Sequence, residues 1–265
     1  MRLVTVVNRE HAGLTLWKTS AENHGFKPEI LGFNDSRPLG HSHNAFGVKF
    51  MVLAAFLKTI SPDDLCLVTD GFDVVIADSH DRLQARILRN LQHHKLLFCA
   101  ELYENPDQGM PWQANRLPYL NAGVYAGKAG DILNSLIPFF KLPLDSQIVT
   151  DDQRYWTHYY FGHPDIIKID HNGDVFACLL DVKERSDAGV LHFQGFYKDL
   201  SHLSATRLWN LAKAIHRPRT LLSSIGDNLT SFGLLALPVL GAYPRIVPCI
   251  TGFVLVTMLL YMLPL

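Results

Sequence analysis

The amino-acid sequence predicts an α/β domain with a mostly parallel central sheet, followed by a C-terminal hydrophobic helical tail. Apolar runs of strand length alternate with stretches of helical periodicity over about the first 200 residues. The run Leu65–Thr69 is apolar almost throughout, which is typical of a strand covered on both faces. Residues 246–265 contain no charged side chain. A chain of 265 residues has room for one such domain and an appendage.

The elements follow from these patterns in chain order. Leu14, Trp17 and Ala21 have helical spacing between the first two strands, and the apolar stretch 74–77 leads to a helix that Asp78 or Ser79 would cap. Strands are predicted at residues 3–7, 27–31, 65–69, 96–100, 119–127, 166–169, 175–180 and 190–192, the last two completing the sheet. Helices are predicted at about residues 8–24, 48–59, 81–92, 131–140 and 152–160.

The composition excludes some classes of partner. The net charge is −1, and basic residues do not gather into a long patch, so no nucleic-acid partner is expected. The cysteines stand singly inside apolar runs, without the spacing of zinc sites or disulfide frameworks, and are interpreted as core residues of a protein in a reducing compartment. They are Cys66, Cys99, Cys178 and Cys249.

The end of the chain predicts a membrane segment. A helix over the 20 uncharged residues 246–265 would be long enough to cross a bilayer core of roughly 30 Å, although a buried C-terminal helix is the alternative. The preceding stretch 229–243 is interrupted by Pro and Gly, and a second span, a re-entrant segment and an interfacial helix all stay open. We therefore expect three parts: a domain over residues 1–200, a linking helical segment over 201–224 and a hydrophobic membrane segment over 225–265.

The sequence Asp70-Gly71-Phe72-Asp73 follows the central strand and predicts a metal site. Two carboxylates three residues apart can face one cation, although a turn with a helix-capping aspartate has the same pattern. Mn²⁺ and Mg²⁺ prefer oxygen ligands, and Mn²⁺ also accepts an imidazole nitrogen, which makes His192 a candidate third ligand. Asn8, Asp70, Glu101 and His192 each end a different predicted strand, where ligands bind in open α/β sheets.

Two further groups could carry chemistry. Asp151 and Asp152 open a predicted helix; one carboxylate suffices to cap it, and the other could accept a proton from an acceptor hydroxyl or stabilise charge at a sugar carbon. Lys198 is either a surface lysine or a cation that balances a phosphate leaving group.

Taken in order, these motifs resemble the glycosyltransferase domain of procollagen lysyl hydroxylases, which has the GT-A fold. The resemblance spans residues 3 to about 198. The matching segments are Thr5-Val6-Val7-Asn8, Val68-Thr69-Asp70-Gly71-Phe72-Asp73-Val74-Val75, Phe98-Cys99-Ala100-Glu101, Tyr119-Leu120-Asn121-Ala122-Gly123, Asp151-Asp152-Gln153-Arg154-Tyr155, Ile169-Asp170-His171 and His192-Phe193-Gln194-Gly195-Phe196-Tyr197-Lys198.

The resemblance implies roles for these positions. It implies Mn²⁺ ligation by Asp70, Asp73 and His192, and a part in sugar transfer for Asp151 and Asp152. Lys49 matches a family lysine more weakly. The residues implied in binding a UDP-sugar are Val6, Val7, Asn8, Asp70, Gly71, Phe72, Asn121, Gly195, Phe196, Tyr197 and Lys198.

Three departures from the family pattern limit this reading. The family has a tyrosine where Phe72 stands, its acidic run is longer, and its Cys-Trp-Pro loop is absent here, with Trp112 as a stand-in. The hydroxylase part, with its iron and 2-oxoglutarate chemistry, has no counterpart, so lysyl hydroxylation is not predicted.

The sequence thus predicts a Mn²⁺-dependent hexosyltransferase that uses UDP-glucose or UDP-galactose and a hydroxyl acceptor, such as a hydroxylysine-like one. A catalytically inactive, membrane-tethered nucleotide-sugar-binding protein and a metal-dependent phosphohydrolase are the alternatives. Basic residues before the tail predict a cytosolic catalytic domain. The lumenal orientation stays open, because family relatives work in the secretory pathway and Asn228-Leu229-Thr230 has the glycosylation pattern.

Overall fold

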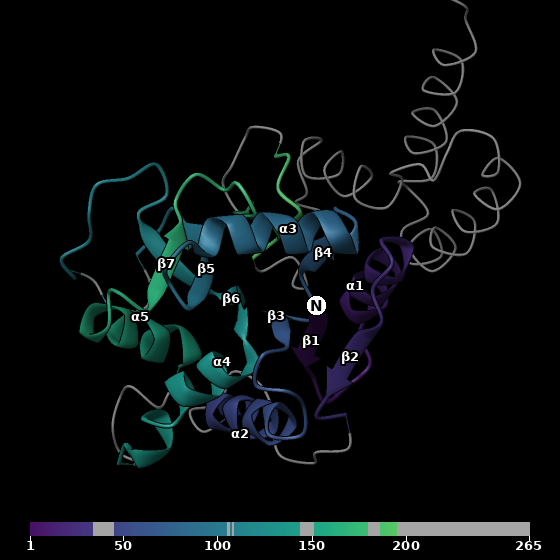
Figure 1. Ribbon diagram of the computed structural model, residues 1–265, viewed down its shortest axis with the longest axis horizontal. Coiled ribbons are helices and arrows are strands. Elements are labelled where there is room, and N and C mark those ends of the chain that lie inside the picture. The colour runs from purple at the N-terminus through teal and green to yellow at the C-terminus, as the bar shows by residue number, and fades with distance from the viewer. Residues whose placement is uncertain (34–44, 105–106, 108, 144–150, 180–185, 195–265) are drawn as a thin grey trace, which may run out of the picture. The chain divides into compact units, whose positions relative to one another are not determined.

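The computed structural model describes residues 1–33, 45–104, 107, 109–143, 151–179 and 186–194 (Figure 1). All of them belong to Met1–His216, the first of two compact units into which the chain divides. The predicted linking segment 201–224 and hydrophobic segment 225–265 lie outside the described residues. Among the helices that are described, none has the length and apolar character needed to span a bilayer.

A six-stranded mixed sheet forms the centre of the domain, in the order β2-β1-β3-β6-β5-β7. Strand β6 runs antiparallel to its neighbours β3 and β5, and the other neighbouring pairs are parallel. The prediction of a mostly parallel sheet is therefore confirmed. The strands are β1 (Arg2–Val6), β2 (Pro28–Leu31), β3 (Leu65–Thr69), β5 (Leu96–Glu101), β6 (Tyr119–Lys128) and β7 (Ile167–Asp170).

A second, three-stranded sheet contains β4 (Val74–Ile76), β8 (Phe176–Cys178) and β9 (Val190–His192), in the order β4-β9-β8. The expectation that the last two strands complete the main sheet was wrong. Strand β4 begins directly after Asp73 and pairs antiparallel with β9, so that Val74 lies opposite His192. The backbone N–H of Phe193 also donates to the carbonyl of Asp73. The small sheet thereby brings the end of β9 to the start of β4.

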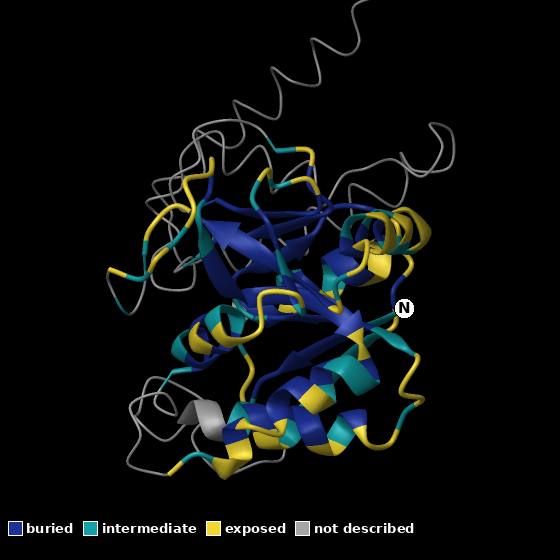
Figure 2. Ribbon diagram, turned by 60° about the vertical axis from the view of Figure 1, so that its left-hand side comes forward, coloured by how far each residue is buried: buried dark blue, intermediate teal, exposed yellow. Residues whose placement is uncertain are grey.

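Helices cover both faces of the central sheet (Figure 1). Side chains of α1 (Ala12–Asn23) and α3 (His80–Leu91) enter one hydrophobic core with residues of β3 and β5. Side chains of α2 (Ala45–Leu57), α4 (Ala129–Leu136) and α5 (Asp152–Gly162) enter a second core on the other face. Figure 2 shows buried strands between helices whose exposed residues point outward.

Helix α4 is shorter than predicted. It ends at Leu136, and a 3₁₀ turn over Phe139–Lys141 follows it. Pro138 explains the difference, because proline has no N–H to donate to the carbonyl four residues earlier.

The end of β3 is fixed from two sides. The indole Nε1 of Trp17 donates to Oγ1 of Thr69 at 2.8 Å, and the hydroxyl of Thr5 donates to the Thr69 carbonyl at 2.8 Å. All three side chains are buried. Helix α1 and strand β1 therefore hold the residue that immediately precedes Asp70.

Candidate metal and sugar-donor site

Asp70, Asp73 and His192 lie together where the two sheets meet. One ligand atom from each lies within 4.8 Å of the others, an arrangement that can hold a metal ion. Asp73 and His192 are buried and Asp70 is partly exposed. Two carboxylates and one imidazole are suitable ligands for Mn²⁺, whereas Mg²⁺ would bind mainly through the carboxylate oxygens. The sequence-predicted ligand set is thus brought to one place from β3, β4 and β9.

The turn that carries the two aspartates is held by the strands around it. The N–H of Asp70 donates to the carbonyl of Gly123 at 2.7 Å. Gly71 has no room for a side chain, because a Cβ there would lie 2.7 Å from Cγ1 of Val7 and 2.8 Å from Oγ1 of Thr5. A glycine at position 71 therefore lets the turn lie against β1.

The hydrogen bonds of His192 favour metal binding through Nε2. Its Nδ1 lies 3.0 Å from Oδ1 of Asn121, and the same oxygen accepts the N–H of Gly123 at 3.0 Å. An amide oxygen only accepts, so Nδ1 carries the proton and the other ring nitrogen keeps a lone pair in the neutral ring. That nitrogen, Nε2, lies 3.6 Å from Oδ1 of Asp73. Metal-binding histidines commonly donate their second N–H in this way.

The electrostatics of His192 also favour a cation. Burial acts to lower the pKa of His192, but the carboxylate of Asp73 raises it more, so that this pKa lies well above its ordinary value. The same negative charge that retains a proton on the ring would attract a divalent ion.

Gly123 allows the close approach of the ligands. A Cβ at position 123 would lie 2.3 Å from Cε1 of His192 and 2.9 Å from Oδ2 of Asp70. Small residues inside a strand often mark a place where another group comes close to the backbone. In the structure, the small residues of β6 allow the backbone to approach two metal-site side chains.

Lys49 connects the metal site to α5. Its ammonium group lies 2.7 Å from Oδ1 of Asp70 and 2.7 Å from Oδ2 of Asp152. Burial acts to lower the pKa of Lys49, but the two carboxylates raise it more, and the pKa lies well above its ordinary value. The lysine is therefore charged at neutral pH and holds both carboxylates.

The two aspartates of α5 have different environments. Asp151 caps the helix, since its carboxylate accepts the N–H groups of Gln153 and Arg154. Burial and the charge of Asp152 raise the pKa of Asp151. Oδ2 of Asp152 contacts Lys49. The sequence left open which of the two carboxylates caps the helix, and in the structure Asp151 is the N-cap residue.

A comparison with family models identifies the family of this chain. The model of the PLOD GT domain matches residues 1–205. The chain belongs to the PLOD GT domain family. The predicted resemblance to this glycosyltransferase domain is thereby confirmed. A comparison with curated proteins gives no match.

Three solved structures are similar to this chain over most of its length. An active-site mutant of LgtC has a TM-score of 0.51 at 16% identity, over 83% of this chain and 98% of that one. A glycosyltransferase involved in glycosylation of the major capsid of PBCV-1 has a TM-score of 0.49 at 14% identity, over 80% and 97%. Mouse xyloside xylosyltransferase 1 has a TM-score of 0.46 at 10% identity, over 74% and 98%. The likeness to LgtC supports the GT-A fold for this PLOD GT domain.

The residues expected to bind the nucleotide lie at the ends of β1 and β3. Val6 and Val7 are buried in the two cores, so only their backbone groups could reach a ligand. Asn8 follows them, and Phe72 lies between the metal-site aspartates. The ring of Phe72 is partly exposed, with the His11 ring 4.7 Å away. This part of the PLOD GT domain has an aromatic face beside the metal site.

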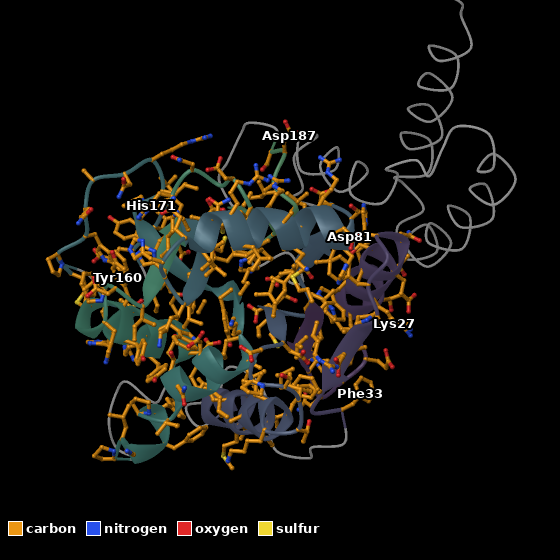
Figure 3. The ribbon with its side chains drawn as sticks, viewed as in Figure 1. Lys27, Phe33, Asp81, Tyr160, His171 and Asp187 are labelled. Carbon is orange, nitrogen blue, oxygen red and sulfur yellow. The ribbon has the colours of Figure 1, made fainter. Side chains whose placement is uncertain are left out.

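The remaining predicted positions divide into two groups. Residues Gly195, Phe196, Tyr197 and Lys198 lie outside the described residues. Trp112, considered as a stand-in for the family's loop tryptophan, stacks on Tyr160 of α5 at 5.6 Å and donates to Glu104 (Figure 3 labels Tyr160). These contacts attach the loop before β6 to the outer part of α5.

Sequence reasoning gave Lys49 too little weight and gave Gln153 no role. Lys49 is the one charged residue of α2, whose other residues are almost all apolar. A lysine in such a helix is largely buried and requires carboxylate partners, and this pattern could have pointed to Lys49 from the sequence. Gln153 carried no comparable pattern.

Proposed function

We propose that this domain is a Mn²⁺-dependent glycosyltransferase that moves glucose or galactose from a UDP-sugar to a hydroxyl acceptor, such as a hydroxylysine-like one. The observation that carries the proposal is the meeting of Asp70, Asp73 and His192 within 4.8 Å in a chain of the PLOD GT domain family. Two carboxylates and one imidazole leave coordination positions free for the oxygens of a diphosphate.

The metal ligands are prepared for this role by their neighbours. Asn121 keeps the proton on Nδ1 of His192, and Gly123 leaves space for the ring. Bound Mn²⁺ would supply positive charge that makes UDP a better leaving group. Lys198 would add a further positive charge near the diphosphate, as the family resemblance implies.

The acidic start of α5 would act on the sugar and the acceptor. Lys49 binds both Asp152 and Asp70 and so holds the Asp152 carboxylate close to the metal-site aspartate. A carboxylate in that position could orient the acceptor hydroxyl or stabilise positive charge at the sugar carbon. Asp151, with its raised pKa, is the second candidate to receive the acceptor proton.

The nucleotide would bind between the ends of β1 and β3. The partly exposed ring of Phe72 can stack on a uracil base, and the backbone of Val6 to Asn8 offers groups for its edge. Asn121, Gly71 and Gly195 to Tyr197 would complete the donor pocket, as the family resemblance implies.

The location of the protein is a separate part of the proposal. The uncharged run 246–265 would anchor it in a membrane, and the basic residues before that run would keep the transferase domain on the cytosolic side. Carbonate extraction of membranes tests the anchor, and release of the whole chain would refute it. A glycan at Asn228 that an endoglycosidase removes would instead place the domain in the lumen.

The transferase activity is tested with a panel of UDP-sugars and Mn²⁺, scored for release of UDP and for products on hydroxylysine peptides and simple glycosides. We expect release that requires metal and that is lost in the double variant Asp70→Ala/Asp73→Ala. Asp81→Ala, on the exposed start of α3, is the matched control and should keep full activity. Full activity in the double variant would refute the proposed site. Binding of UDP with no turnover of any donor would favour an inactive nucleotide-sugar-binding protein.

A further inference from the structure

Strand β6 is irregular where it passes the metal site. On β5, Phe98 pairs with Tyr125, but the next residue, Cys99, pairs with Asn121. Residues Ala122–Val124 of β6 therefore have no partner on β5, and we call them the β6 bulge. Bulges re-aim side chains and are frequent beside active sites.

The β6 bulge contacts both sides of the metal site. Its Gly123 carbonyl accepts the N–H of Asp70, and its Gly123 N–H donates to the side chain of Asn121. Asn121 in turn binds Nδ1 of His192. The shape of the bulge therefore sets the distance between Asp70, which follows β3, and His192, which ends β9.

The side chain of Gln153 fills the gap that the bulge leaves. Its Oε1 accepts the N–H of Ala122 at 2.6 Å, and its Nε2 donates to the carbonyl of Leu120. One amide thus binds the backbone on both sides of Asn121. Gln153 is buried, so these backbone groups receive from it the hydrogen bonds that water would otherwise make.

The hydrogen-bond partners of the Gln153 amide fix its orientation. Nε2 of Gln153 lies 3.0 Å from Oε1 of Glu101, which is buried at the end of β5. Because the carbonyl of Leu120 only accepts and the N–H of Ala122 only donates, the NH₂ group of the amide must face Leu120 and Glu101, and its oxygen must face Ala122. The orientation of the amide is therefore determined at both ends.

We infer that Gln153, which is hydrogen-bonded to Glu101, is a positioning residue for the metal site: it holds the β6 bulge so that Asn121 aims His192 at the cation. Gln153 contacts none of the three ligands and acts through Ala122, Gly123 and Asn121. The inference rests on the proposed function only in that it assigns a metal to this site.

A purely structural role for Gln153 predicts a different effect of its substitution on stability and metal affinity. Loss of its hydrogen bonds would then lower the melting temperature and leave the metal affinity of the folded protein unchanged. A positioning role predicts a loss of metal affinity beyond that of an equally destabilised variant. Tyr155→Phe is the matched control, because it removes a buried hydrogen bond of the same helix, to the Ser135 carbonyl, away from the bulge.

The first measurement is the Mn²⁺ affinity of the full-length protein, read from the electron paramagnetic resonance of free Mn²⁺ below the melting temperature. We expect Gln153→Met to weaken binding about 10- to 100-fold, the range found when outer-shell partners are lost. Tyr155→Phe should bind as the wild type does. The double variant Gln153→Glu/Glu101→Gln exchanges the donor and the acceptor between these two side chains, and it keeps an oxygen that accepts from the N–H of Ala122. It should bind Mn²⁺ more tightly than Gln153→Glu alone. Wild-type affinity in Gln153→Met, or an equal loss in Tyr155→Phe, would overturn the inference.

The second measurement needs no metal. In the metal-free protein, the Nδ1–H proton of His192 should give a slowly exchanging NMR resonance that Gln153→Met loses and Tyr155→Phe keeps. Persistence of this resonance in Gln153→Met would refute the positioning role. Failure of the wild type to bind Mn²⁺ would instead refute the proposed metal function, and this second measurement would still decide the role of Gln153.

Discussion

Lys49 and Asp152 form an ion pair of 2.7 Å across 103 residues of sequence, with side chains that are only 13% and 12% exposed. The same ammonium group binds Asp70, so one cation links helix α2, the end of β3 and the start of α5. Helices α2 and α5 cover the same face of the central sheet, and the pair fixes the acidic start of α5 relative to the candidate metal site. The charge of Lys49 therefore connects these elements at the candidate site.

Removal of this charge should destabilise the protein. In Lys49→Met, Asp152 and Asp70 lose their cation while Asp152 stays buried. We expect the free energy of unfolding to fall by about 3 kcal/mol. This is the lower end of the range for a broken buried pair, because Asp70 is partly exposed. Urea unfolding without divalent ions measures this. Lys58→Met, just after the same helix at an exposed position, should change stability little. Equal midpoints for the two variants would contradict the prediction.

A side chain at position 123 should disrupt the metal site. The Cβ of Gly123→Ala would meet the ring of His192 at 2.3 Å, so the ring must move. We expect Mn²⁺ affinity to fall at least about 10-fold and stability to fall by about 1–3 kcal/mol from overpacking. Gly162→Ala is the control, because a Cβ at the end of α5 meets no atom within 4 Å. Isothermal titration with Mn²⁺ compares the two, and unchanged affinity in Gly123→Ala would show that the ring is not held there.

The strands of the main sheet and the meeting of Asp70, Asp73 and His192 could be predicted because both follow simple patterns. Long apolar runs mark β3 and β5, and the ends of such strands are where ligand side chains gather. Two strands of the second sheet were predicted, at residues 175–180 and 190–192, but they were assigned to the main sheet, because strands of three residues show no pattern that tells which strand they pair with. The arrangement around Gln153 depends on a register shift in β6, which leaves no mark in the sequence.

The residue between the two aspartates offers a test of nucleotide binding. The family has a tyrosine where Phe72 stands, and the Phe72 ring is partly exposed beside Arg9 and His11. We expect Phe72→Tyr to tighten UDP binding a few-fold, since one added hydrogen bond contributes about 0.5–1.5 kcal/mol. Phe72→Ala should weaken it by removing the aromatic face. Titration with UDP at saturating Mn²⁺ measures both changes. UDP affinities that are the same in all three proteins would exclude this ring from the nucleotide site.

Glu101 predicts a dependence of stability on pH. Burial raises its pKa to about 7, although His192, Asn121 and Gln194 act to lower it. In the unfolded chain, this carboxyl has a pKa of about 4.3. Between these values, the folded protein binds the extra proton, so the stabilising contribution is complete below the unfolded pKa and is lost as the pH rises towards 7.

The difference of about 2.7 pKa units corresponds to a total loss of about 3.7 kcal/mol, of which about 3 kcal/mol falls below pH 7 and the rest above it. Glu101→Gln keeps an oxygen that accepts from Gln153 but cannot ionise, so the stability of this variant should fall less than that of the wild type from pH 4.5 to 7. Urea unfolding at several pH values across this interval measures the difference. Divalent ions are removed with a chelator, because a nearby cation would favour the ionised carboxylate. Glu22→Gln, on an exposed face of α1, should follow the wild-type curve. Parallel curves for Glu101→Gln and the wild type would show that the buried carboxyl is already ionised at pH 4.5.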